Sequence, residues 1–373
     1  MIGELGALHR WLALVMLMLL ETGPVAAAPG GVERLRLPAG LAIEVYASGV
    51  SNARQMALSD SGVLWVGSRD AGVVSAVLPA SGAEPRRVMT VARGFEMPTG
   101  IALFGGDLYI ADISSVYRIR DADSRLAERL AGGSSLRVER VYDGLPRDTH
   151  HGWRYLRVDR EGRLVVAIGA PCNVCDRDAD GYAQIVRMRP DGSQREVLAR
   201  GVRNSVGFDF EPGTGQLWFT DNGRDWLGDD QPSCELNRIV QPGQHFGFPF
   251  CHQGDLLDPQ FGQGRRCSEF VAPVARLGAH VAPLGMTFWR GSVVVALHGS
   301  WNRSRKSGYK VVRVVLGSDP AQPVLRVEDL VSGWLDGQTA WGRPADVLAM
   351  PDGSLLIADD QQGLVYRLFE RQP

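Results

Sequence analysis

The sequence predicts an all-β fold, a six-bladed β-propeller, on three observations. A turn glycine, followed by a short β-branched or aromatic run and then a small or polar residue, recurs six times. The copies follow one another at intervals of about 40 residues or more, the spacing of propeller blades. Glycine and proline, 45 and 21 residues, punctuate the chain throughout, and no long segment has the 3.6-residue period of a helix.

In chain order, the repeated phrases define one strand for each blade. They read VLWVG after Gly62, DLYIA after Gly106, RLVVA after Gly162, QLWFT after Gly215, SVVVA after Gly291 and SLLIA after Gly353. Most are followed by a second strand-forming run, as at residues 116–119, 185–188, 309–314 and 365–368. A propeller gathers loops from every blade around one channel, so we expect functional residues directly after the repeated strands.

Two further segments complete the predicted architecture. Residues 41–47 alternate like a strand, and we expect them to pair with the last blade and close the ring. Residues 223–290 separate the fourth and fifth repeats and form the longest insertion. Long loops inside a compact domain are often functional.

The N-terminus carries a targeting signal. Arg10 precedes an apolar stretch at residues 11–20, and small residues follow at 24–28, which predicts a signal peptide over residues 1–28. Ten apolar residues are too few to span a bilayer, although an uncleaved anchor is the alternative interpretation. Residues 29–373 would then form a single propeller domain in the periplasm or outside the cell. The formal net charge of −2 gives no indication of a nucleic acid or an anionic membrane as partner.

Five cysteines in an exported chain predict disulfides. Cys251 and Cys267 flank a glycine-containing loop and are the favoured pair. Cys172 and Cys175 form a CxxC that precedes Asp rather than His, which argues against haem attachment, and no second CxxC supports zinc. We expect a short disulfide there, with a free dithiol as the alternative. Cys234 remains as a buried free thiol.

Three loops concentrate reactive or charged residues. His150 and His151 precede the third repeat and suit a general base, a metal ligand or a structural role. The fourth repeat is flanked by Arg203 and Asn204 and by an acidic span at 221–235, which suggests either a hard-cation site or a solvated loop. Residues 298–306 combine an aromatic residue with several cations, as suits a planar anion or a basic surface loop. Arg343 precedes the sixth repeat as a further cation.

These phrases together resemble the soluble quinoprotein sugar dehydrogenases, the glucose/sorbosone dehydrogenase family, whose members are six-bladed propellers. The resemblance covers residues 143–368 well, whereas residues 30–140 agree mainly in repeat pattern. It is most specific in four stretches, residues 150–169, 203–239, 246–251 and 279–303.

The resemblance implies pyrroloquinoline quinone (PQQ) and Ca²⁺ as cofactors and assigns roles to individual residues. His151 matches the catalytic base, and Arg203 and Asn204 match the pair that contacts the quinone. Gly223 and Arg224 match the positions whose backbone carbonyls hold Ca²⁺. Arg343 matches a residue facing the cofactor carboxylates, and Arg303 stands in for the family's lysine. Where some members carry a second arginine, this chain has Ala345.

The implied reaction is oxidation of an aldose or a sorbosone-like sugar to a lactone or acid. His151 removes the hydroxyl proton while hydride passes to the quinone, and either a quinone or a cytochrome then takes the electrons. Two alternatives stay open on the residues alone. One is a calcium-dependent propeller lactonase or other hydrolase, and the other is a non-catalytic propeller that binds carbohydrate or protein.

Overall fold

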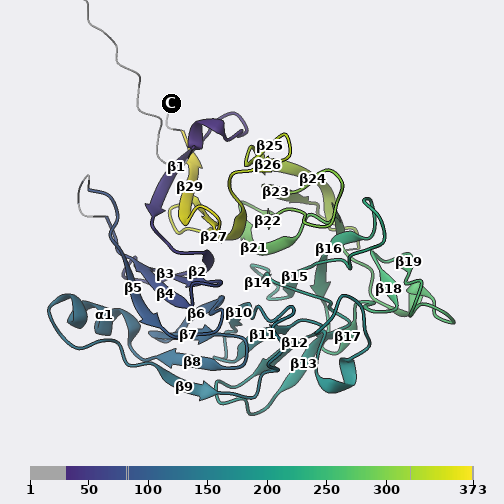
Figure 1. Cartoon of the computed structure of the whole chain (residues 1–373), viewed down its shortest axis with the longest axis horizontal. Helices are drawn as coiled ribbons and strands as arrows, with labels where there is room; N and C mark the ends of the chain where they lie inside the picture. Colours follow the sequence, from purple (N-terminus) through teal and green to yellow (C-terminus); the bar gives the residue numbers. More distant parts are fainter. Residues whose placement is uncertain (1–30, 81, 83, 320, 372–373) are drawn as a thin grey trace, which may run out of the picture.

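Six sheets of four or five strands surround a common centre and confirm the predicted six-bladed β-propeller (Figure 1). The computed structural model describes residues 31–80, 82, 84–319 and 321–371. The expected signal peptide therefore lies outside the described residues. Among the described residues, no helix combines the length and apolar character needed to cross a membrane.

The blades follow one another in chain order. The first consists of β2 (Ala53–Leu58), β3 (Leu64–Ser68), β4 (Val73–Val77) and β5 (Val88–Arg93). The second consists of β6 (Gly100–Phe104), β7 (Asp107–Ala111), β8 (Val116–Ile119) and β9 (Glu139–Tyr142). The third consists of β10 (Leu156–Val158), β11 (Leu164–Ile168), β12 (Gln184–Met188), β13 (Glu196–Arg200) and β17 (Gln244–His245).

The remaining blades have the same antiparallel plan. The fourth consists of β14 (Phe208–Phe210), β15 (Leu217–Asp221), β16 (Ser233–Ile239) and β20 (Ala275–Ala279). The fifth consists of β21 (Pro283–Trp289), β22 (Ser292–Leu297), β23 (Lys310–Leu316) and β24 (Val324–Val331). The sixth consists of β27 (Pro344–Ala349), β28 (Leu355–Asp359), β29 (Leu364–Glu370) and β1 (Leu41–Ser48).

Short elements complete the described chain. They are helix α1 (Ala122–Leu130), the 3₁₀ turns η1 (Val32–Arg34), η2 (Asp178–Asp180) and η3 (Cys267–Glu269), and the strand pairs β18 (Cys251–His252) with β19 (Leu256–Leu257) and β25 (Leu335–Asp336) with β26 (Thr339–Ala340).

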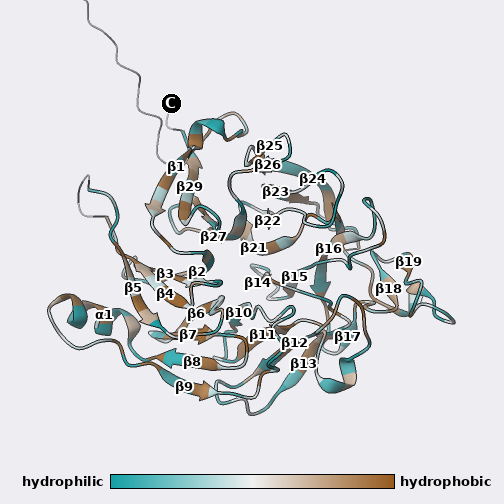
Figure 2. Ribbon diagram, in the orientation of Figure 1, coloured by the Kyte–Doolittle hydropathy of each residue, from teal (hydrophilic) through white to brown (hydrophobic). Residues whose placement is uncertain are grey.

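The six repeated phrases form the second strand of each blade, as predicted. These strands are β3, β7, β11, β15, β22 and β28, and nearly all their residues are buried. A strand inside a blade has a neighbouring blade on each face, which explains its continuous apolar run rather than an alternating one. Apolar residues accordingly gather in the strands, whereas hydrophilic residues follow many of the loops (Figure 2).

The ring closes through the first described strand, which confirms the predicted pairing. β1 runs antiparallel to β29, with Leu41 opposite Glu370 and Ser48 opposite Leu364. The two ends of the propeller therefore belong to one sheet. Such closure removes two free strand edges and ties the first segment to the last.

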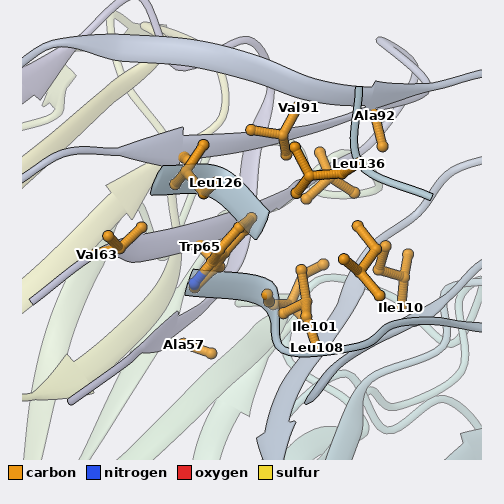
Figure 3. Packing of buried hydrophobic residues seen from close by; sticks show 14 residues of the cluster. Ala57, Val63, Trp65, Val91, Ala92, Ile101, Leu108, Ile110, Leu126 and Leu136 are labelled. Atoms are coloured by element: carbon orange, nitrogen blue, oxygen red, sulfur yellow. The ribbon is translucent and has the colours of Figure 1, made fainter. Parts of the chain in front are cut away.

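Apolar side chains fill the space between blades. Between the first two blades, Trp65 packs with Ile101 and Leu108, and Leu126 of α1 covers the cluster (Figure 3). The Trp65 Nε1–H donates to Asp123 Oδ1 at 3.1 Å, so this buried indole keeps its hydrogen bond.

The long insertion links the third and fourth blades. Its strand β17 joins the third blade in parallel to β13, and its strand β20 completes the fourth. The disulfide Cys251–Cys267 lies within it, and Cys172–Cys175 forms the second disulfide. Both predicted pairs are thus confirmed, and Cys234 is buried and free, as expected.

Candidate active site

A cavity of about 400 Å³ opens among loops of several blades. Arg69, Asn222 and His298 line it directly after β3, β15 and β22, where the repeat pattern predicted functional residues. Other lining residues lie at or just before first strands of blades: Arg54, His150, His151, Trp153, Arg203, Asn204, Ala282, Leu284 and Arg343. The cavity is therefore built by residues distant in sequence that the ring of blades brings together.

His151 is held as a neutral imidazole with a defined tautomer. Its Nδ1 lies 2.8 Å from the carbonyl oxygen of Ala170. A carbonyl oxygen only accepts, so Nδ1 carries the proton and Nε2 keeps a free lone pair. Burial, reinforced by the positive charge of Arg203, holds the pKa of His151 well below 6.5. His151 thus has the form that a general base needs in neutral solution.

The backbone around His151 explains why glycine follows the third repeated strand. A Cβ on Gly169 would lie 2.6 Å from the Cβ of His151, closer than side chains approach. His151 itself has a φ of 52°, in the left-handed region. Its neighbour His150 is exposed, and the two rings meet edge to face with centroids 4.1 Å apart. Both histidines line the cavity, but His151 is the buried one.

Arg203 is buried, and all five N–H donors of its guanidinium are used. Nη1 donates to the carbonyl oxygens of Asn222 and Gly223, at 3.2 and 3.0 Å. Nε donates to the carbonyl of Asn173, and Nη2 donates to Asn173 Oδ1, each at 2.8 Å. Nη2 also lies 3.2 Å from the carboxylate of Asp225. This network fixes the guanidinium in one orientation.

Asn173 was not predicted from the sequence, and its position is informative. It lies between Cys172 and Cys175, whose disulfide closes the loop around it. Asn173 Oδ1 also accepts the backbone N–H of Asp225 at 2.8 Å. The disulfide loop therefore positions both the cation and the anion at this side of the cavity. The CxxC spacing was the available signal, but it predicted a stiffened loop rather than a contact with Arg203.

Four lining residues present buried polar atoms without a hydrogen-bond partner among the described residues. They are Arg54 Nε, Arg69 Nε, Trp153 Nε1 and Asn204 Oδ1, although Arg69 Nε forms an ion pair with Asp70 at 3.3 Å. Buried polar groups are normally paired, so three donors and one acceptor at one cavity indicate partners supplied by a ligand. The backbone of Asn204 is itself anchored, because its N–H donates to Asp221 Oδ1 at 2.7 Å.

Four arginines line the cavity, and three of them have a carboxylate partner. Arg54 forms a buried ion pair with Asp360 at 2.9 Å, Arg69 pairs with Asp70 at 3.3 Å, and Arg203 pairs with Asp225 at 3.2 Å. Arg343 Nε and Nη2 donate to the carbonyls of His298 and Gly299, at 3.1 and 3.0 Å. The charge of Arg343 is thus held by backbone carbonyls, and this favours an anionic ligand beside it.

A second histidine of the lining is paired with a carboxylate. His298 Nε2 donates to Asp360 Oδ1 at 2.9 Å, and burial lowers the pKa of His298 to about 4. Asp360 therefore bridges His298 and Arg54, which joins the fifth, sixth and first blades. Cys234 also lines the cavity, and burial raises the pKa of its thiol to about 11, so it stays protonated at neutral pH.

Gly223 and Arg224 occupy different surroundings. Gly223 lines the cavity, and its carbonyl oxygen accepts the hydrogen bond from Arg203. The side chain of Arg224 pairs instead with Asp258, a residue of the long insertion, at 2.5 Å. Asp258 also accepts a hydrogen bond from His252 Nε2 at 2.8 Å.

Arg303 is not brought to the cavity. It is absent from the described lining residues, and its Nη2 donates to Asp230 Oδ1 at 2.9 Å. The loop after β22 crosses to the loop after β15, and the pairing with Asp230 draws Arg303 toward that loop. Arg303, expected to stand in for a cofactor-binding lysine, therefore lies outside the described lining. The lining arginines besides Arg203 and Arg343 are Arg54 and Arg69.

The acidic span also differs from the interpretation as a clustered cation site. Within the described residues, no group of three or more His, Cys, Asp or Glu side chains is arranged to hold a metal. Asp221 caps backbone N–H groups, Asp225 pairs with Arg203, and Asp229 accepts the N–H of Ser304. Asp230 pairs with Arg303. Each carboxylate has a protein partner that fixes a loop.

Comparisons with known proteins identify the family. A sequence model described as glucose/sorbosone dehydrogenase matches residues 122–367. This chain belongs to the glucose/sorbosone dehydrogenase family. An uncharacterised protein of Borreliella burgdorferi is 29% identical over 378 residues, covering 97% of this chain and 98% of that protein. A pyrroloquinoline quinone-dependent pyranose dehydrogenase of Coprinopsis cinerea is 34% identical over 117 residues, 26% of this chain and 16% of that protein.

Solved structures share the fold of this family member. The holo PQQ domain of the Coprinopsis cinerea pyranose dehydrogenase has a TM-score of 0.76 at 20% identity, covering 90% of this chain and 97% of that one. The PQQ-bound aldose sugar dehydrogenase of Streptomyces coelicolor has a TM-score of 0.63 at 20% identity, covering 89% and 99%. At these identities the likeness establishes the six-bladed propeller.

Proposed function

We propose that this protein is a PQQ-dependent sugar dehydrogenase that oxidises an aldose or a sorbosone-like sugar to a lactone or acid. The arginine-lined cavity with a neutral, tautomer-defined His151 carries the proposal. Family membership and similarity to PQQ-bound sugar dehydrogenases support it. A hydrolase or a simple binding propeller has no need for four arginines converging on the same cavity as a neutral histidine.

The cavity suits PQQ in size and charge. Its volume of about 400 Å³ lies within the usual range for ligand sites. We propose that Arg343, together with Arg54 and Arg69, contacts the three carboxylates of this planar tricyclic compound, although Arg54 and Arg69 also have the carboxylate partners Asp360 and Asp70. The unpartnered Arg54 Nε and Trp153 Nε1 are donors, and Asn204 Oδ1 is an acceptor, so the ligand can satisfy both kinds.

Calcium fits the oxygen donors beside this site. Carbonyl and carboxylate oxygens are its preferred ligands, and Gly223 and Asp225 present both kinds at the cavity. The Gly223 oxygen already accepts one hydrogen bond from Arg203, and a carbonyl oxygen has a second lone pair. We propose that the carbonyls of Gly223 and Arg224 hold Ca²⁺, with Asp225 offsetting its charge.

When bound, PQQ supplies the two-electron oxidising chemistry of the reaction. The chain's contribution is a base, a fixed electrostatic environment and orientation. His151 Nε2 accepts the proton of the sugar hydroxyl, while Nδ1–H stays hydrogen-bonded to Ala170 and stabilises the imidazolium that forms. Arg203, clamped by Asn173, holds positive charge in place without reorganising during the reaction.

We further propose that the protein works in the periplasm or outside the cell. The two disulfides support this, because such bonds persist in oxidising compartments. The apolar N-terminal stretch would direct export. Electrons would then pass to a quinone or a cytochrome.

Reconstitution tests the proposed function. Purified mature protein is mixed with PQQ and Ca²⁺, and a panel of aldoses and sorbosone is screened with an artificial dye acceptor. We expect sugar-dependent dye reduction that requires PQQ and disappears with a chelator. Absence of dye reduction across the panel, in protein shown to have bound PQQ, would contradict the proposal.

A further inference from the structure

Two tryptophans are conspicuously exposed beside the cavity. Trp226 is 65% exposed and Trp301 is 70% exposed, and their rings meet edge to face with centroids 5.5 Å apart at 85°. Trp301 also lines the cavity. Trp226 follows β15, and Trp301 follows β22, so two blades contribute to one aromatic corner.

The loops that carry these rings are tied together. The backbone N–H of Trp226 donates to Asn302 Oδ1 at 3.4 Å. Asp229 Oδ1 accepts the N–H of Ser304 at 2.9 Å, and Asp230 pairs with Arg303 at the same distance. These contacts hold the loops in register. The exposed rings are thus preorganised, which lowers the entropic cost of binding a ligand.

The chemistry of this corner suits a sugar ring. A pyranose with equatorial hydroxyls presents axial C–H groups on its faces, which pack well on an indole. Asn302 follows Trp301 directly, and Arg305 and Lys306 come four and five residues later in the same loop; all three side chains carry hydrogen-bond donors that suit sugar hydroxyl groups. A protein partner fits less well, because a stable protein interface buries about 800 Å² on each side, far more than two side chains offer.

We propose that Trp226 and Trp301 form a saccharide platform at the cavity mouth that binds the second ring of a β-linked glucan fragment. This inference rests on the proposed sugar oxidation. The cavity of about 400 Å³ is near the lower end for ligand sites, so a tricyclic cofactor and one sugar unit fill it. Any further sugar unit lies at the mouth, where Trp301 stands. The platform makes short oligosaccharides better substrates than monosaccharides.

Binding to the protein without PQQ tests the platform directly. Cellotriose and glucose are titrated calorimetrically into the native protein and into the Trp226→Ala and Trp301→Ala variants. Leu325→Ala is the matched control, because Leu325 is also 65% exposed but lies on β24 and is not among the lining residues. We expect each tryptophan variant to weaken cellotriose binding about 10-fold, and the control to leave it unchanged.

The PQQ-loaded enzyme gives the second readout. The preference for cellotriose over glucose, as the ratio of their kcat/KM values, should fall about 10-fold in each tryptophan variant. Equal cellotriose binding by native protein and both variants would overturn the platform. The platform would also be overturned if the tryptophan variants slowed electron transfer to a protein acceptor but not to a dye, or if their only effect were to dissociate a dimer. Failure to bind PQQ would refute the proposed function, while the titration on PQQ-free protein would still decide the platform.

Discussion

Replacing His151 with Gln should lower the turnover of the PQQ-loaded enzyme by about 10²–10⁴-fold, the usual contribution of a general base. Gln retains an amide N–H that can donate to the carbonyl of Ala170, so the loop keeps its anchor. An amide cannot accept the substrate proton at neutral pH. The substitution therefore removes the base while preserving size and polarity.

His150 provides the matched control for this substitution. It lies beside His151 at the same cavity but is exposed, and no hydrogen bond fixes its tautomer among the contacts described for it. His150→Gln should cost less than about 10-fold in kcat, well below the contribution of a general base. The comparison separates loss of the base from a general disturbance of the loop.

The assay measures kcat at saturating PQQ and sugar, together with the dissociation constant of PQQ for each variant. PQQ affinity should change little in His151→Gln, because this residue acts on the substrate proton. Near-native kcat in a folded, PQQ-loaded His151→Gln enzyme would refute the assignment. Equal losses in both histidine variants would refute the argument from tautomer and burial.

Three further predictions follow from the site. Burial lowers the pKa of His151, so the base is unprotonated at neutral pH. As the pH is lowered, kcat/KM should therefore stay level down to pH 6.5 and fall only below it. A pH profile of kcat/KM whose acid limb has its midpoint above pH 6.5 would contradict this. Asn173→Ala removes the acceptor of Arg203 Nη2 and should raise the dissociation constant of PQQ roughly 10-fold by calorimetry, whereas native affinity would disprove the clamp. Thiol titration of the denatured, unreduced protein should find one free thiol, Cys234; three or five would mean missing disulfides.

The strands and their closure into a ring were predictable because the signal is local and repeated. A buried second strand in every blade requires a continuous apolar run, and the turn glycine before it marks each start. The alternating pattern of residues 41–47 likewise predicted β1. Helix α1 escaped prediction because its nine residues bury little more than Ala122 and Leu126, too few to establish a helical period.

Part of the cavity was also predictable. The expectation of functional residues directly after the repeated strands holds for Arg69, Asn222 and His298. The residues singled out from the loop motifs and the family resemblance, His151, Arg203, Asn204 and Arg343, lie before first strands of blades and line the same cavity. Their sequence contexts are compact motifs, which a single sequence can reveal.

Contacts between distant blades could not be predicted in the same way. Arg54 reaches the cavity through an ion pair with Asp360 that exists only once the last blade meets the first. The resemblance offered Arg303 for the family's lysine, but the sequence could not show that its side chain pairs with Asp230 outside the described lining. The partners of the acidic residues were hidden in the same way, because they lie on other loops, as Ser304 does for Asp229.

The most direct test of the account is an equilibrium titration of PQQ into the purified PQQ-free protein with Ca²⁺ present. The arginine-lined cavity predicts saturable binding of one PQQ per chain, weakened in Arg343→Gln by about 10-fold or more through loss of a charge-assisted contact. The Arg326→Gln control, an exposed arginine of β24 outside the cavity, should bind like the native protein. No binding at high micromolar PQQ with saturating Ca²⁺ would contradict the central claim.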